Sequence, residues 1–132
     1  MTSSLPIGYV FISYSHHNIA IQRGILASLR KRGIPVWIDE ENLEPGTPNW
    51  ERAIENAIKG CGAFLVLLSP AASESEWVLR EVIYADDHQK RIVPALIAGD
   101  KKSAVPLHLN SYQRIDLTKT KDWDLGLEFV QK

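Results

Sequence analysis

Three short runs of this sequence are apolar at almost every position: YVFISYS at 9–15, AFLVLLS at 63–69 and RIVPALIA at 91–98. Strands without polar alternation are typical of a parallel sheet that helices cover on both faces. Two weaker runs, PVWID at 35–39 and QRIDL at 113–117, have the composition of further strands. The sequence therefore predicts a sheet of five strands.

Segments with helical spacing of apolar side chains lie between these runs. Residues 18–32 form the first segment, and Gly33 follows it as a C-terminal cap. A second helix is expected to have Thr47 as its N-cap and Pro48 in its first turn, and to end at Gly60. Each predicted helix thus follows a predicted strand.

A third helix is expected to open with a capping box formed by Ser73 and Glu76. The side chains that it turns toward the core are expected to be Val78, Val82 and Ala85. Residues 40–48 and 99–111 are expected to be polar loops, and KDWDLGLEFVQK at 121–132 begins a last helix.

The alternation of strands and helices predicts parallel strands joined by right-handed crossovers. The simplest arrangement is a flavodoxin-like α/β fold, with a five-stranded parallel sheet of order 2-1-3-4-5 and helices on both faces. Its ligand crevice is expected at the carboxyl ends of strands 1 and 3, where the strand order reverses. The segments 13–18, 40–48 and 69–81 would border that cleft, and Pro94 favours the end of the fourth strand or an irregular stretch.

The length of 132 residues is typical of a single domain. A net charge of -1, from 15 basic and 16 acidic side chains, does not favour binding to nucleic acid or to an anionic membrane. Neither a membrane span nor a secretory signal is expected. Cys61 is the only cysteine, so an internal disulfide is excluded and a cytoplasmic location is expected. Because the sequence stops within a predicted helix, we expect the domain to come from a longer multidomain protein.

Several classes of chemistry lack the residues they need. No Walker-type or Rossmann glycine motif is present, because Gly60-x-Gly62 precedes a strand instead of following one. The four histidines have no metal-ligand spacing, so no metal site is expected, and Cys61 is expected in a turn or in the core. A phosphoryl-accepting receiver domain would need an aspartate after the third strand, where this chain has Ser69 and Pro70.

Carboxylates remain as candidate functional groups. Four of them crowd the end of the second strand: Asp39, Glu40, Glu41 and Glu44. The simplest interpretation is a solvated loop, except for Asp39, which ends an apolar strand. Glu81 by itself would be an exposed helix residue, but Trp77 precedes it by one turn. An indole can stack on a flat ring while a carboxylate binds a ribose or stabilises an oxocarbenium ion. These residues alone leave both interpretations open.

Four segments, in this order and with matching spacing, resemble a known family: YVFISYSHHN, VWIDEENLEPGTPNWERAI, FLVLLSPAASESEWVLREV and RIVPALI. They are similar to a Toll/interleukin-1 receptor (TIR) domain, most of all to the bacterial, NAD-cleaving type. The resemblance extends from about residue 8 to the end of the sequence. His16 and His17 depart from the arginine or acid that members often carry there, and Pro48 is an additional proline.

The resemblance implies an NAD+ nucleosidase or cyclase that breaks the bond between nicotinamide and ribose, with Glu81 as its catalytic residue. NAD+ would be the substrate, and no cofactor is implied. The substrate-binding residues would be Trp77, Tyr14, Ser15, Asp39, Leu43 and Trp50. The family's BB loop, which follows the second strand, would bind other TIR domains through Glu44, Pro45 and Gly46.

Two other functions fit the same resemblance. The first is a non-catalytic scaffold that acts only through TIR–TIR interaction, and the second is a nucleotide sensor without turnover. Glu81 favours the enzyme, because a scaffold does not need a carboxylate at that position. Catalysis and assembly are compatible, since catalytic members commonly complete a site across neighbouring subunits.

Overall fold

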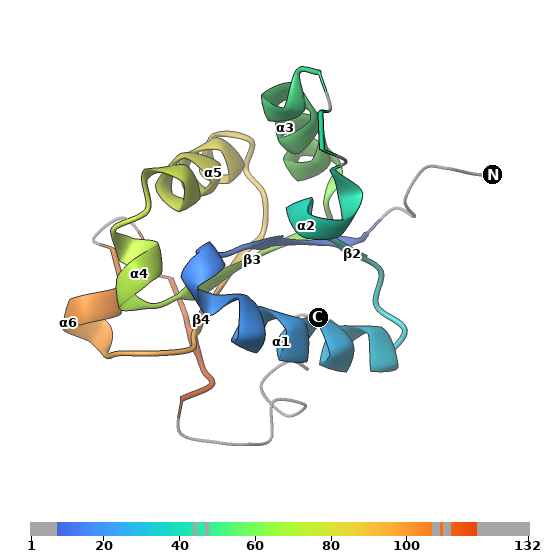
Figure 1. The fold of residues 1–132 in the computed structure, drawn as a ribbon. Coiled ribbons are helices and arrows are strands. Elements are labelled where there is room, and N and C mark those ends of the chain that lie inside the picture. The colour runs from blue at the N-terminus through green and yellow to red at the C-terminus, as the bar shows by residue number, and fades with distance from the viewer. Residues whose placement is uncertain (1–7, 44, 47, 107–108, 110–111, 119–132) are drawn as a thin grey trace.

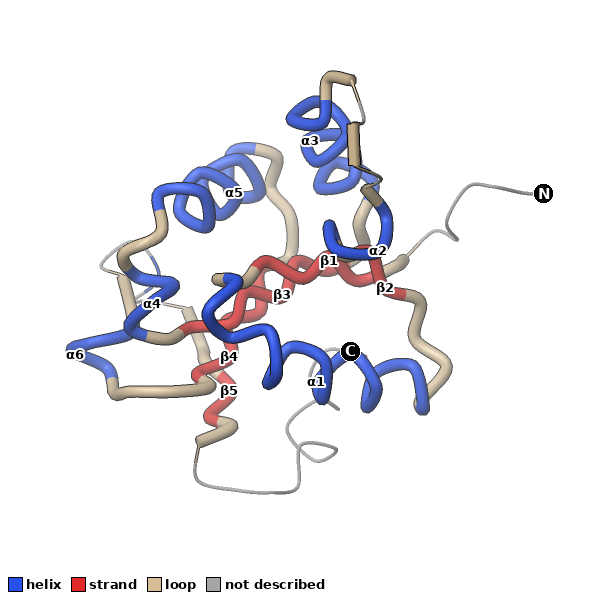
Figure 2. Tube along the Cα trace, viewed as in Figure 1, coloured by secondary structure: helices blue, strands red, loops and turns tan. Residues whose placement is uncertain are grey.

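A five-stranded parallel sheet forms the centre of the molecule (Figure 2). The structure is a computed structural model that describes residues 8–43, 45–46, 48–106, 109 and 112–118. The strands lie in the order β2-β1-β3-β4-β5, which confirms the predicted topology. Their bounds are β1 Val10–Ser13, β2 Val36–Trp37, β3 Ala63–Leu68, β4 Ile92–Leu96 and β5 Ile115–Asp116.

Helices cover both faces of the sheet, as the unbroken apolar strands predict (Figure 1). One face packs against α1, Ile19–Lys31, and the other packs against α3, Trp50–Gly60, and α5, Glu76–Asp87. Gly33 follows α1 with a φ of +77°, so the expected glycine cap is present.

The sheet divides the core into two layers. Val10 and Ile12 of β1 pack in the layer of α1, whereas Phe11 packs in the layer of α3 and α5. Phe11 also stacks on Trp37 of β2 and Phe64 of β3, with ring centroids 5.0 and 5.3 Å apart. Every residue of β1 and β3 is buried, so both faces of these two strands are covered.

Pro94 lies in the middle of β4, not at its end or in an irregular stretch as expected. The carbonyl of Leu96 accepts a hydrogen bond from the N–H of Leu117, so Pro94, two residues earlier, also faces β5. Pairing between these strands begins only at Ala95 and Ile115. The missing N–H of the proline therefore removes no bond from the described ladder.

The helix after the BB loop begins later than expected. Its first residue is Trp50, and its N-cap is Asn49, which has a left-handed backbone and makes no side-chain capping bond. Pro48 is therefore outside the helix, and the predicted cap Thr47 lies outside the described residues. A turn at Asn49 thus takes the place of the predicted cap.

The helical segment after β3 is divided into two helices. The first is α4, Pro70–Ser73, which Ser69 caps, and the second is α5, which Ser75 caps. Each capping hydroxyl accepts a hydrogen bond from the backbone N–H three residues further on. The capping box predicted at Ser73 is therefore wrong, because Ser75 takes that role. The buried stripe of α5 includes the predicted side chains Val78, Val82 and Ala85.

Three short helices begin where the sequence predicts no helix to begin. They are η1 His16–Asn18, α2 Asp39–Asn42 and α6 Lys101–Ala104. Asp100 caps α6 in a reciprocal pair with Ser103, which explains why this polar stretch becomes helical. The helix predicted at 121–132 lies outside the described residues.

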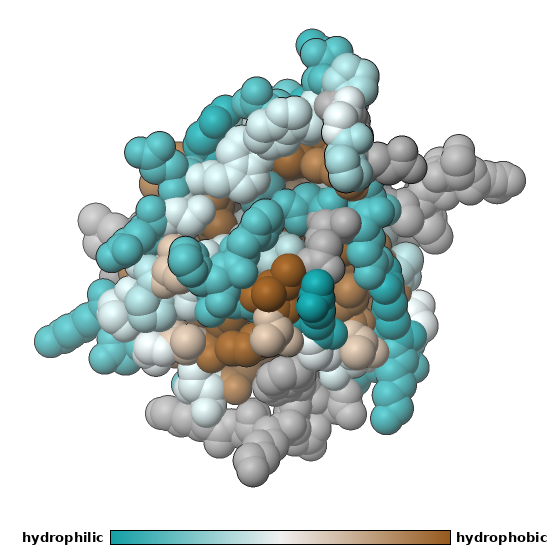
Figure 3. Space-filling model, in the orientation of Figure 1, coloured by the Kyte–Doolittle hydropathy of each residue, from teal (hydrophilic) through white to brown (hydrophobic). Residues whose placement is uncertain are grey.

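Hydrophilic side chains cover most of the face drawn in Figure 3 and surround a smaller hydrophobic area. Within the described ranges, no helix has the length and apolar character to cross a membrane. In a sheet of this topology, ligands bind among the elements that follow the strands at their carboxyl ends.

Candidate active site

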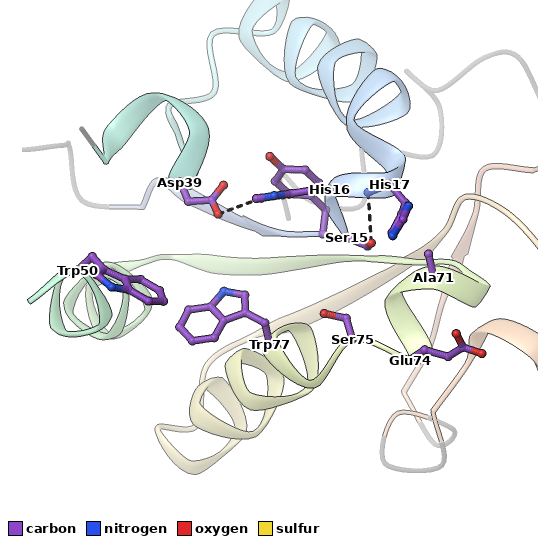
Figure 4. A pocket seen from close by; sticks show the side chains of 10 residues that line it. Ser15, His16, His17, Asp39, Trp50, Ala71, Glu74, Ser75 and Trp77 are labelled. Atoms are coloured by element: carbon purple, nitrogen blue, oxygen red, sulfur yellow. Dashed lines mark hydrogen bonds and ion pairs between the residues drawn. The ribbon is translucent and has the colours of Figure 1, made fainter. Parts of the chain in front are cut away.

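A cleft of about 840 Å³ lies at the carboxyl ends of β1, β2 and β3, where the strand order reverses (Figure 4). Its lining comes from the segments after these strands, as the topology predicts. The lining residues are Tyr14, Ser15, His16, His17, Asp39, Trp50, Ala71, Glu74, Ser75 and Trp77. The volume falls within the range of pockets that hold small molecules.

Glu81 lies behind this cleft and does not line it. The residue is only 6% exposed, and its Oε1 accepts a hydrogen bond of 2.6 Å from the hydroxyl of Ser13. Ser13 is two residues after Phe11 and therefore points to the same face of the sheet, which α5 covers. Glu81 follows Val78 and Trp77 by three and four residues, so it shares their side of the helix.

Burial raises the pKa of Glu81 to about 8, because a charged carboxylate is costly to remove from water. Hydrogen bonds from Ser13 and Trp77 lower the pKa, whereas the negative charge of Asp39 raises it. The net effect is a carboxyl group that changes its charge near neutral pH. Such a group is suited to functional chemistry, although structural carboxylates can also be shifted in this way.

Two tryptophans form one end of the cleft (Figure 4). The rings of Trp50 and Trp77 have centroids 4.9 Å apart and an interplanar angle of 45°. Trp77 is partly buried against the core, whereas Trp50 is 45% exposed. The guanidinium of Arg80 lies 5.1 Å from the ring centroid of Trp77. This end of the cleft can therefore offer aromatic surface to a flat ring.

Polar groups face the tryptophans from the other side of the cleft. Asp39 begins α2, and its Oδ2 lies 3.4 Å from Nε2 of His16. Its Oδ1 is buried and has no hydrogen-bond partner among the residues that the structure describes. The hydroxyl of Ser15 accepts a hydrogen bond from the N–H of His17, and the ring of Tyr14 lies 5.2 Å from that of His16. The free oxygen of Asp39 leaves an acceptor for a ligand hydroxyl.

Residues 10–130 of this chain match the family model of the TIR domain. The chain belongs to the TIR domain family. The predicted family and fold are thereby confirmed, and the narrower assignment to a bacterial, NAD-cleaving type stays a prediction.

Three of the similar proteins come from animals. The TIR domain is 30% identical over 129 residues to the stimulator of interferon genes protein of Magallana gigas, covering 89% of this chain and 31% of that protein. A metazoan TIR-STING receptor from C. gigas, in complex with 2′,3′-cGAMP, has 26% identity and a TM-score of 0.78, covering 96% of this chain and 40% of that one. The TIR domain of the Toll-related receptor TRR-2 of Hydra magnipapillata has 19% identity and a TM-score of 0.78, covering 93% and 98%, respectively. This chain thus spans about a third of the curated relative's length.

Most of the predicted site residues of this TIR domain meet at the cleft. The five that line it are Tyr14, Ser15, Asp39, Trp50 and Trp77. Leu43 does not line it, because its side chain packs against the core layer of α3 and α5. Pro45 and Gly46 lie in an exposed turn, and Gly46 has a φ of +83° that favours glycine. Glu44 lies outside the described residues.

The sequence did not single out Ser13 as a site residue. A hydroxyl at the end of an otherwise apolar strand is the signal that could have found it, because a buried hydroxyl requires a partner. Five further residues line the cleft and lie in the segments predicted to border it, although they were not named as site residues: His16, His17, Ala71, Glu74 and Ser75. In the described part of the chain, no group of three or more histidine, cysteine, aspartate or glutamate residues is placed to hold a metal ion.

Proposed function

We propose that this TIR domain is an NAD+ nucleosidase or cyclase that releases nicotinamide and forms ADP-ribose or a cyclic ADP-ribose. The observation that carries the proposal is Glu81, a buried carboxyl group that Ser13 holds directly behind the aromatic end of a cleft. Cleavage of a nicotinamide riboside requires two groups: an aromatic surface that binds the flat nicotinamide ring, and a carboxylate near the ribose.

The reaction breaks the bond between C1′ of the ribose and the ring nitrogen of nicotinamide. The bonding electron pair moves to that nitrogen, so a cationic pyridinium leaves as neutral nicotinamide without general-acid help. The ribose is left as an oxocarbenium ion, which a carboxylate stabilises electrostatically. Water then adds to C1′ and loses a proton, giving ADP-ribose, or a nitrogen of the adenine adds to give a cyclic product.

Three side chains of the cleft, together with Glu81 behind it, have roles in this scheme. Trp77 and Trp50 would stack on the nicotinamide ring, and the free Oδ1 of Asp39 would accept a hydrogen bond from a ribose hydroxyl. The positive charge of the bound nicotinamide would favour the ionised form of Glu81, whose pKa is about 8 in the free protein. Substrate binding would therefore supply the carboxylate that the reaction needs.

Assembly with other TIR domains is part of the proposal. Pro45 and Gly46 form an exposed turn that is available to a second copy, and Gly46 has the positive φ that keeps this turn sharp. Because assembly depends on concentration, turnover per molecule should rise as the protein is concentrated or clustered on beads. The NAD+ assay is therefore best carried out under clustered conditions.

The test is HPLC of NAD+ incubated with wild type and with Glu81→Ala at high protein concentration. We expect wild type to release nicotinamide and Glu81→Ala to be slower by about 100-fold or more, since the oxocarbenium ion loses its counter-charge. Glu76→Ala is the matched control, because Glu76 is an exposed glutamate of the same helix that does not line the cleft. This control should keep the wild-type rate.

A non-catalytic scaffold is the second candidate. It is favoured by the 6% exposure of Glu81 and by its absence from the lining of the cleft, since a buried pair can simply complete a protein layer. Absence of nicotinamide from clustered wild type would support the scaffold and contradict the enzyme. Equal turnover by Glu81→Ala would leave the enzyme in place but contradict the role given to Glu81.

A further inference from the structure

The hydroxyl of Ser13 makes the contact that fixes Glu81 in the structure. Its Oγ donates to Oε1 of Glu81 over 2.6 Å, although the two residues are 68 positions apart in the sequence. We infer that Ser13 is a positioning residue that holds the carboxylate of Glu81 in place and favours its ionised form. The inference deepens the proposed NAD+ cleavage and rests on it for its effect on turnover.

The position of Ser13 in the fold leaves its hydroxyl few other options. It is the last residue of β1, it is 1% exposed, and the other three residues of the strand are apolar. Its side chain points into the layer of α5, where Val78 and Val82 pack on either side of Glu81 along the helix. A buried hydroxyl without a hydrogen-bond partner would destabilise the folded chain, and the bond to Glu81 supplies that partner.

Ser69 is a second buried serine at the end of a strand, and it bonds other partners than Glu81. It follows β3 and is 1% exposed; its hydroxyl caps α4 by accepting a bond from the N–H of Ala72, and it donates to Oδ1 of Asn18 over 2.6 Å. Ser13 instead donates to the carboxylate of Glu81 on α5. Loss of the Ser69 hydroxyl therefore removes the contacts of a buried serine without removing the hydrogen bond to Glu81, which makes Ser69 the control for Ser13.

The contact also opposes the effect of burial on the charge of Glu81. Burial and the negative charge of Asp39, at the start of α2, favour the neutral acid. The Ser13 hydroxyl and Trp77, on the same helix as Glu81, favour the carboxylate. Removal of the hydroxyl from β1 leaves one of these two opposing hydrogen bonds, so Glu81 should ionise only at higher pH.

The experiment is a titration of the Glu81 side-chain carboxyl by ¹³C NMR, together with the pH profile of kcat/KM for nicotinamide release, which reports the free protein. In Ser13→Ala, we expect the NMR midpoint and the rising limb of the profile to move up together by about one pH unit. That shift corresponds to about a tenfold loss of kcat/KM at pH 7. Ser13→Thr, which keeps the hydroxyl, should restore most of both values. Ser69→Ala should leave the NMR midpoint where it is in wild type.

An unchanged NMR midpoint in folded Ser13→Ala would overturn the inference, and so would an equal shift in Ser69→Ala. If Ser13→Ala does not fold, Ser13→Cys provides the measurement, because a thiol is a weaker donor of similar size and should give a smaller upward shift. An unchanged midpoint there would again contradict the inference. The NMR titration does not require turnover, so a wild type that releases no nicotinamide refutes the proposed function while the midpoint still decides the role of Ser13.

Discussion

Two side-chain pairs meet one turn apart on α5, and they differ in almost every physical respect. Ser13 and Glu81 are 1% and 6% exposed and are joined by a single polar bond of 2.6 Å. Trp50 and Trp77 lie at one end of the cleft, where Trp50 is 45% exposed and the rings make a tilted contact (Figure 4). The pKa of Glu81 is about 8, so the buried pair holds a proton at neutral pH, whereas the aromatic pair is suited to receive a flat ring.

Two positions one turn apart on a helix can have different roles because their side chains are buried to different depths. Trp77 precedes Glu81 by four residues, so both side chains point toward the same side of α5. The strand β1 ends beneath Glu81 and supplies Ser13, whereas α3 begins beside Trp77 and supplies Trp50. A rigid strand end thus positions the acid, and an exposed helix start positions the aromatic surface.

The largest expected effect concerns the pH dependence of stability, and Glu81→Gln is the change that reveals it. Between about pH 4.5 and 8, the folded chain keeps a proton on Glu81 that the unfolded chain has released. The free energy of unfolding should therefore fall as the pH rises through this range, by up to roughly 4 to 5 kcal/mol. Urea unfolding at pH 5 and pH 9 should show a clearly smaller difference in Glu81→Gln than in wild type.

Glu76→Gln serves as the control for that measurement. Glu76 is exposed in the first turn of the same helix, so its amide variant should retain the pH dependence of wild type. If Glu81→Gln and wild type lost stability in parallel between pH 5 and 9, the buried pair would not be the site that keeps the proton, and the contrast with the aromatic pair would fail.

A smaller effect is expected when each tryptophan is truncated. Trp77→Ala should lower the free energy of unfolding by about 2 to 3 kcal/mol, because the ring packs against the core layer of α3 and α5. Trp50→Ala should cost about 1 kcal/mol or less, because this ring is 45% exposed. Chemical denaturation of the two variants measures both values. Equal losses would mean that Trp50 is as firmly held as Trp77, and the cleft would then have two rigid walls.

The sequence predicted the sheet because unbroken apolar runs such as 63–69 allow few alternatives, and the predicted order agrees with the structure. The local turn at Asn49 was missed, because a left-handed residue before Trp50 has no strong signature in composition. The cap of α5 was placed two residues early, since the segment from Ser73 to Ser75 contains two serines that suit the role.

The candidate site was predicted in part. Resemblance and topology brought Asp39 and Trp77 to one cleft, because each follows a strand at the same edge of the sheet. The bond from Ser13 to Glu81 was not predicted, because it joins elements 68 residues apart and depends on the depth at which α5 packs. Leu43 was expected near the substrate, but it turns into the core because α2 carries it inward.

The smallest expected effect comes from Arg80, which lies at the outer edge of the aromatic pair. Its guanidinium is 5.1 Å from the ring centroid of Trp77 and 3.3 Å from Oε2 of Glu51 on α3. Both charged side chains are mostly exposed, at 65% and 56%, so Arg80→Ala should cost about 0.5 kcal/mol or less in urea unfolding. Arg80→Lys, which keeps the charge without the planar group, is the matched control and should stay closer to wild type. A loss of 2 kcal/mol in Arg80→Ala would show that this edge is held as firmly as the buried pair, because screened, exposed charges alone do not give an effect of that size.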